Sequence, residues 1–178
     1  MKTLQNIDDI EKIVRQQLIL QSEVDAKFVR NSLSLHGEVL EKMLMEQVYS
    51  PISTTDVVVL FELRSRTNDS DGSETNENVT SYYKSFKVYV IIYGGNSTNI
   101  ANNIVARFRT SAVRQVLYDN GIYLEAVTEP ERINEYKNET MWIRNDIQID
   151  ISCQLDIKQI SADYTFDSLS NVTINIRS

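Results

Sequence analysis

The sequence predicts an α+β domain in which a single antiparallel sheet packs against helices. Apolar residues recur at steps of three and four in residues 1–50, and they alternate in most of the apolar segments of residues 56–178. The expected helices and strands are grouped and do not alternate along the chain, which favours an antiparallel sheet. A chain of 178 residues can bury the core of one domain, so we expect residues 1–178 to fold as a unit.

The N-terminal part is predicted to be helical. Residues 4–20 carry an amphipathic stripe, with acids in the first turns that suit the helix dipole. Residues 25–37 show no clear pattern, and we expect them to be irregular or briefly extended. Helical spacing returns over residues 38–48 and ends before Pro51.

Two strands with a long connection follow. Alternating apolar residues predict strands over 56–65 and 83–93. Residues 65–80 between them are polar and acidic and cannot fold by burying their own side chains, so we expect a long, mobile hairpin loop. Loops of this length are often functional. The acids of this loop are candidate interaction residues: Asp69, Asp71, Glu74 and Glu77.

The second half is predicted to contain one helix and three strands. A continuous helix is expected over 97–118, with Ala112 and Val116 in its apolar row. Asn120-Gly121 closes this helix, because glycine accepts a left-handed turn. The remaining segments are strands at 122–127, 142–157 and 171–177, and a polar loop at 128–140.

Charge and composition exclude several classes of protein. The net charge of −7 disfavours binding of nucleic acid, which depends on clustered Lys and Arg side chains. An acidic surface still suits a passage through which DNA moves without sticking. The single cysteine, Cys153, excludes an intrachain disulfide, and no apolar run is long enough to cross a membrane. We expect a cytosolic protein with no membrane partner.

Residues 90–108 raise the question of a phosphate site. A strand ends at Gly94-Gly95 and a helix begins at once, which is the outline of a phosphate cradle. Phosphate-binding motifs need further glycines or a lysine at fixed spacing, and this stretch has neither. We therefore interpret the glycines as a turn, with Asn96 or Ser97 as the N-cap.

No catalytic, metal or cofactor site is predicted. The only histidine, His36, excludes a two-histidine zinc site, and Cys153 lies on the apolar face of its strand. Glu135 and Lys137 have the Glu-x-Lys spacing of metal-dependent nucleases, which is an alternative from a different class. That chemistry needs a core strand with a second acid close by, whereas residues 128–140 have little apolar content.

Aromatic side chains mark further candidate interaction residues. Trp142 and Arg144 are two residues apart, so they share the polar face of the strand over 142–157. An exposed Trp there needs a covering loop or another subunit. Four tyrosines enrich a surface suited to protein contact: Tyr82, Tyr83, Tyr89 and Tyr93.

Residues 80–178 resemble the neck and tail-terminator (tail-completion) proteins of tailed bacteriophages. In that family a strand ending in Tyr-Gly leads to a helix and a short Gly-Ile strand, and a loop then precedes a Trp-x-Arg strand. The corresponding residues here are Tyr93-Gly94, Gly121-Ile122 and Trp142-Ile143-Arg144. The strand over 56–65 extends the resemblance, and the first 50 residues match less well.

The resemblance implies a tail-terminator-like fold and a structural virion protein without catalysis or cofactors. Such proteins form a ring, commonly of six subunits, on the last ring of the tail tube, stop its growth and meet the head connector. The implied partners are other copies of the chain, the tail-tube protein, the head-completion or connector protein, and DNA that passes through the lumen without specific binding. The implied location is the tail or neck of the virion, after synthesis in the host cytoplasm. Another head–tail connector or tube-related ring protein is the alternative within this class.

Overall fold

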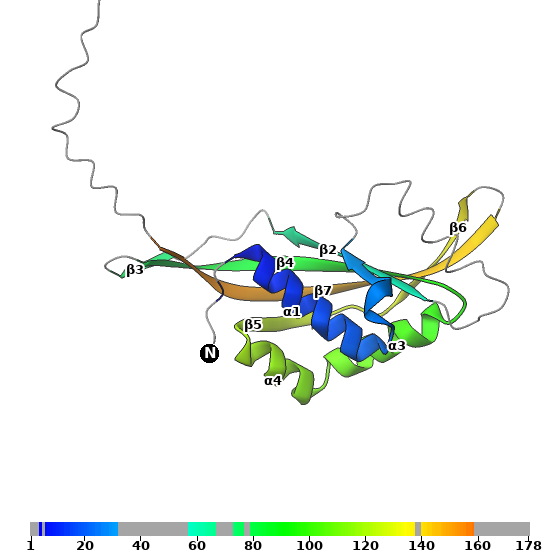
Figure 1. Ribbon diagram of the computed structural model, residues 1–178, viewed down its shortest axis with the longest axis horizontal. Helices are drawn as coiled ribbons and strands as arrows, with labels where there is room; N and C mark the ends of the chain where they lie inside the picture. Colours follow the sequence, from blue (N-terminus) through cyan, green and yellow to red (C-terminus); the bar gives the residue numbers. More distant parts are fainter. Residues whose placement is uncertain are drawn as a thin grey trace, which may run out of the picture.

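Helices cover one face of a seven-stranded sheet, so the protein is α+β as expected (Figure 1). The sheet is mixed and not purely antiparallel, because β1 (Val29–Asn31) runs parallel to β2 (Val58–Ser65). Its strand order is β1-β2-β4-β7-β5, with β3 paired to β4 and β6 paired to β7. The computed structural model describes Leu4 and residues 6–31, 57–66, 73–76, 79–137 and 140–158.

Two long antiparallel strands form the centre of the sheet. β4 (Val79–Tyr93) pairs along its whole length with β7 (Thr140–Lys158). At about 3.3 Å per residue, β7 spans about 60 Å. Both of its ends therefore project beyond the helices, one beside β3 and the other beside β6 (Figure 1).

The predicted N-terminal helix is confirmed as α1 (Ile7–Ser22). It begins three residues later than expected, because Asn6 caps it by accepting a hydrogen bond from the Asp9 backbone N–H at 2.9 Å. Leu4 instead pairs with Leu155 of β7. In the described part of residues 25–37, which ends at Asn31, a 3₁₀ turn, η1 (Ala26–Phe28), leads into β1. The helix expected over 38–48 lies outside the described residues.

The helix expected over 97–118 is two helices, α3 (Ser97–Phe108) and α4 (Ser111–Asp119). Thr110 breaks the run because its backbone is extended and its hydroxyl caps α4, accepting a hydrogen bond from the Val113 N–H at 3.4 Å. The chain changes direction there, so Ala112 and Val116 are exposed and do not continue the buried row. The expected turn after α4 is confirmed, since Gly121 has a φ of 82°.

Two strands occupy segments in which loops were expected. β3 (Ser73–Asn76) pairs with the start of β4, and β6 (Glu131–Lys137) pairs with the start of β7. Both are polar strands held by main-chain hydrogen bonds to a long neighbour, so they need no apolar alternation of their own. β5 (Ile122–Val127) has the predicted bounds, with a bulge between Leu124 and Ala126. The strand expected over 171–177 lies outside the described residues.

One hydrophobic cluster joins the helices to the sheet. It contains the alternate residues of β4 and β7 that face the helices, together with the buried rows of α1, α3 and α4. The predicted alternation of β7 is confirmed from Ile147 to Leu155, and Cys153 is fully buried within it. None of the described helices is long and apolar enough to cross a membrane.

Candidate interaction surface

The face of the sheet opposite the helices carries a row of charged and polar side chains, and we call it the open face. The ladder registers place every second residue of the long strands on this face. Its charged and polar members at the centre of the sheet are Glu62, Arg64, Lys87, Tyr89, Tyr93, Arg144, Asp146, Gln148 and Asp150. Val58 and Leu60 lie on the same face and are buried.

Arg144 is the centre of one cluster on the open face. Its guanidinium donates to the Glu135 carboxylate on β6 and to the Asp146 carboxylate, each at 3.1 Å. The Tyr93 hydroxyl on β4 donates to the same Glu135 oxygen at 3.2 Å. The cluster therefore ties β4, β6 and β7 together at the end of β7 where the chain enters it.

Burial shifts the pKa values of two groups in this cluster. Burial raises the pKa of Asp146 above its usual value, and the neighbouring Arg144 opposes that change. Burial likewise raises the pKa of Tyr93. Tyr93 is 8% exposed, so the expectation that it contributes to a contact surface is wrong. Among the described residues, the buried atoms Arg144 Nε and Asp146 Oδ1 find no hydrogen-bond partner, which leaves both groups incompletely satisfied there.

Further ion pairs engage the other arginines of the open face, Arg64 and Arg66. Arg66 donates to Asp150 at 2.8 Å and to Glu125 of β5 at 3.1 Å. Arg64 binds Glu62 through two hydrogen bonds, and its guanidinium lies 5.0 Å from the ring centroid of Tyr89. These basic side chains are each engaged by a carboxylate. They do not form the free basic patch that a phosphate backbone would need.

The other predicted interaction residues fall in different places. Tyr83 is 54% exposed, whereas Tyr82 packs against the core on the helix side. The backbone of Trp142 pairs with Glu135 in the β6–β7 hairpin, two residues from Arg144 as expected, and its side chain is outside the described part. Of the four acids, Glu74 belongs to β3, where only its backbone is described, opposite Ser81. The remaining three lie outside the described residues: Asp69, Asp71 and Glu77.

The glycines after β4 form a turn, which supports the structural interpretation of residues 90–108. Gly94 has a φ of 128° and its carbonyl accepts from the Ser97 N–H at 3.1 Å. Asn145 of β7 donates from its amide to the Ser97 hydroxyl at 2.9 Å and to the Thr98 hydroxyl at 3.3 Å. Ser97 is fully buried. The N-terminus of α3 is therefore filled by a side chain of the sheet where a phosphate would have to bind.

The Glu135 carboxylate, on which the nuclease alternative depends, is engaged by other side chains of the sheet. Glu135 lies on β6, a polar strand beside β7, and its carboxylate is held by Arg144 and Tyr93. Among the described residues, no group of three His, Cys, Asp or Glu side chains is placed to hold a metal ion. Cys153, the only cysteine, is buried, and burial raises the pKa of its thiol to about 11.

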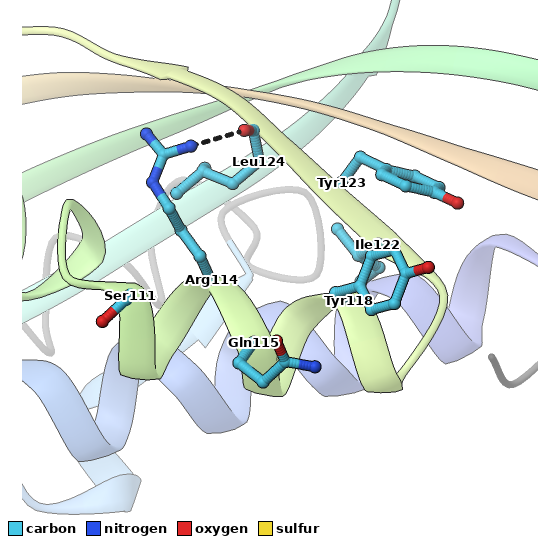
Figure 2. A pocket seen from close by; sticks show the side chains of 7 residues that line it. All are labelled: Ser111, Arg114, Gln115, Tyr118, Ile122, Tyr123 and Leu124. Atoms are coloured by element: carbon cyan, nitrogen blue, oxygen red, sulfur yellow. Dashed lines mark hydrogen bonds between the residues drawn. The ribbon is translucent and has the colours of Figure 1, made fainter.

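A cavity of about 360 Å³ lies between α4 and β5, and we call it the α4–β5 cavity. Figure 2 shows Arg114 reaching across it, where its guanidinium donates to the Leu124 carbonyl of β5 at 3.2 Å. The rings of Tyr118 and Tyr123 meet edge to face, with centroids 5.4 Å apart. The cavity is lined by Ser111, Arg114, Gln115, Tyr118, Ile122, Tyr123 and Leu124.

Comparison with known proteins identifies the family. The sequence model of a family described as "Phage neck terminator protein" matches residues 8–176, nearly the whole chain. The chain belongs to the phage neck terminator family. Its members are structural proteins of the phage neck, so this chain is a structural phage protein of the neck, and the resemblance described above is confirmed. A search of curated proteins finds no match.

Several residues of this neck terminator protein that organise the surface were not predicted from its sequence. The ion pairs of Arg66 could not be predicted from the sequence, because they depend on the strand register that brings Glu125 and Asp150 close to it. The role of Asn145 could have been recognised in the sequence. It is a polar residue at one of the alternate positions of β7 that are otherwise apolar, such as Ile147. A buried amide in such a row indicates a polar partner on the covering helix.

Proposed function

We propose that this protein is a tail terminator, which forms a ring that caps the tail tube, stops its growth and joins it to the head connector. The observation that carries the proposal is the family match over residues 8–176. We infer a ring of six subunits from the resemblance to tail-terminator proteins. Another head–tail connector or tube-related ring protein is the second candidate, because the same family match supports a neck protein of either kind.

The shape of the subunit supports assembly into a ring. The ends of β7 project on opposite sides of the helix-covered body, so each can reach a different neighbour (Figure 1). In a closed ring each subunit uses two different surfaces, one for each neighbour. Within the described residues, β5 and β6 pair only with β7, which leaves one edge of each strand for another chain.

The charges of the protein support a lumen through which DNA passes without specific binding. The open-face arginines are engaged by carboxylates, and the chain carries a net charge of −7. Residues 67–78 contain four acids and no Lys or Arg, which accounts for four of the seven excess negative charges. Like charges on the lumen wall would keep the phosphate backbone mobile. We propose that these acids face the lumen or a neighbouring subunit.

The first experiment measures the mass of the purified protein by light scattering, with negative-stain images of the same sample. Closed rings are expected, and their mass divided by 20.5 kDa gives the subunit number. A protein that stays monomeric at high concentration and also fails to bind purified tail tubes would refute the terminator function.

A tube-capping assay separates the terminator from other ring proteins. Tail-tube protein is polymerised with and without the protein, and tube lengths are measured in images. A terminator stops growth and appears at one end of each tube. Rings that leave tube length unchanged would favour the second candidate. Asp69→Asn with Asp71→Asn, two acids of the 67–78 stretch, should leave ring mass unchanged if these acids face the lumen, and should change it if they contact a neighbour.

A further inference from the structure

We propose that the α4–β5 cavity receives residues 171–177 of a second copy of this chain, which add to β5 as a further strand. The proposal rests on the ring proposed above and names one contact within it. The segment reads NVTINIR, and its alternating Val172, Ile174 and Ile176 predict a strand with one apolar side. Such a strand needs both a sheet edge and an apolar site to cover that side.

The cavity offers a sheet edge with outward-facing carbonyl groups. β5 pairs only with β7 in the described part of the chain, so its other edge faces the cavity. The Leu124 carbonyl accepts a hydrogen bond at 3.2 Å from the Arg114 side chain, which reaches it from α4 across the cavity (Figure 2). The Val127 carbonyl accepts from the Arg109 side chain at 2.9 Å. A carbonyl oxygen has two lone pairs, so an arriving strand can donate an N–H to Leu124 beside or in place of Arg114.

The rim of the cavity exposes apolar surface that an added strand would cover. Tyr118, one of the residues that line the cavity, is 45% exposed. Aromatic side chains such as Tyr118 and Tyr123 are enriched where protein surfaces meet. Asp119 lies at the C-terminal end of α4 beside this rim, and Arg177 gives the segment a complementary positive charge.

The geometry of β7 favours a neighbouring copy as the source of the segment. Cys153 pairs with Ile122 at the cavity, and β7 then continues for five residues to Lys158. At 3.3 Å per residue the described part of β7 ends about 16 Å beyond the cavity and points away from it (Figure 1). The twelve residues 159–170 can span at most about 40 Å, so residues 171–177 of one copy are within reach of the cavity of an adjacent subunit. The family match continues to residue 176, so the segment belongs to the sequence shared by the family.

Disulfide trapping between full-length chains tests the proposal. Gln115→Cys places a thiol on the cavity wall, and Ile174→Cys places one in the segment of a separately prepared protein. The two are mixed, allowed to exchange subunits and oxidised. Cys153 adds little background because it is fully buried. The matched control is Asn102→Cys, an exposed position on α3 that is not among the residues lining the cavity.

A disulfide between the two different chains is expected for Gln115→Cys and not for Asn102→Cys. The double variant Gln115→Cys/Ile174→Cys should then give a covalent ladder up to the full ring. Disulfides formed only within one chain would overturn the second copy as the source, and no disulfide would overturn the docking site itself. Light scattering on the same samples shows whether rings are present, so failure of this contact is distinguishable from failure of the proposed function.

A second pair of variants tests the predicted side of the strand. Ile174→Asp puts a charge on the apolar side and should weaken ring assembly at least tenfold. Thr173→Asp lies on the opposite side of the same strand and should leave assembly within about twofold of the unmodified protein. Equal effects of the two variants would contradict docking of the segment as a strand.

Discussion

The side chain of Asn145 attaches the N-terminus of α3 to the centre of the sheet, and its removal tests that attachment. Asn145 is 1% exposed and donates to the hydroxyls of Ser97 and Thr98. Asn145→Ala leaves the buried Ser97 hydroxyl without this donor, which costs on the order of 1–3 kcal/mol. For a chain of this size, about 2 kcal/mol lowers the melting temperature by roughly 4–8 °C.

The assay is urea unfolding followed by circular dichroism, at a protein concentration low enough that ring assembly does not add to the stability. The matched control is Asn102→Ala, an exposed asparagine on α3, which should change the free energy of unfolding by less than about 0.5 kcal/mol. A double-mutant cycle with Ser97→Ala should give a coupling energy of about 1 kcal/mol. Additive single effects, or an Asn145→Ala variant as stable as the control, would refute the attachment.

Three further predictions concern stability and reactivity. The Cys153 thiol should resist a thiol reagent at pH 8 in the folded protein and react at once in urea, because burial raises its pKa to about 11. The stabilising contribution of the protonated Cys153 thiol is fully present below pH 9 and is lost as the pH rises to about 11. The free energy of unfolding of Cys153→Ala should therefore depend less on pH in that range. Thr110→Ala removes the cap of α4 and should cost about 1 kcal/mol, whereas Thr110→Ser should be nearly neutral. Glu135→Gln should cost less than about 1 kcal/mol in urea unfolding, since this ion pair is partly exposed, and Arg144→Leu should cost more because it also strips Asp146 of its partner.

The central strands could be predicted because one of their faces is buried and the other is not. In β7 every second residue from Ile147 to Leu155 contacts the core, and burial imposes that period on the sequence. The same reasoning predicted β5 with its observed bounds. Strand pairing itself was not predictable in detail, since β1 is three residues long and carries no period of its own.

The break between α3 and α4 could not be found from apolar spacing alone. Apolar residues continue at helical intervals through the break, so the pattern joins the two helices into one. The informative residue was Thr110, whose hydroxyl favours a cap over a helix interior. Val116 shows the consequence, because it keeps the helical spacing and yet is 43% exposed.

The Arg144 cluster was only partly predictable. Strand alternation correctly placed Arg144 on the polar face of its strand. Its partner Glu135, however, was assigned to a loop. Only the β6–β7 register brings these side chains together, and Tyr93 joins them from a third strand. The period within one strand does not encode a contact between strands.

The two strands missing from the sequence prediction, β3 and β6, lie at opposite ends of β7. Each is paired to a long strand and is rich in polar residues, because a strand that projects beyond the core has no apolar layer to cover. These strands lack an apolar period because they lie at the ends of the molecule, where a neighbouring subunit of the proposed ring would be reached first. In a protein that functions by assembly, polar segments that pair with a long central strand are therefore better first candidates for interfaces than the apolar alternation that defines its core.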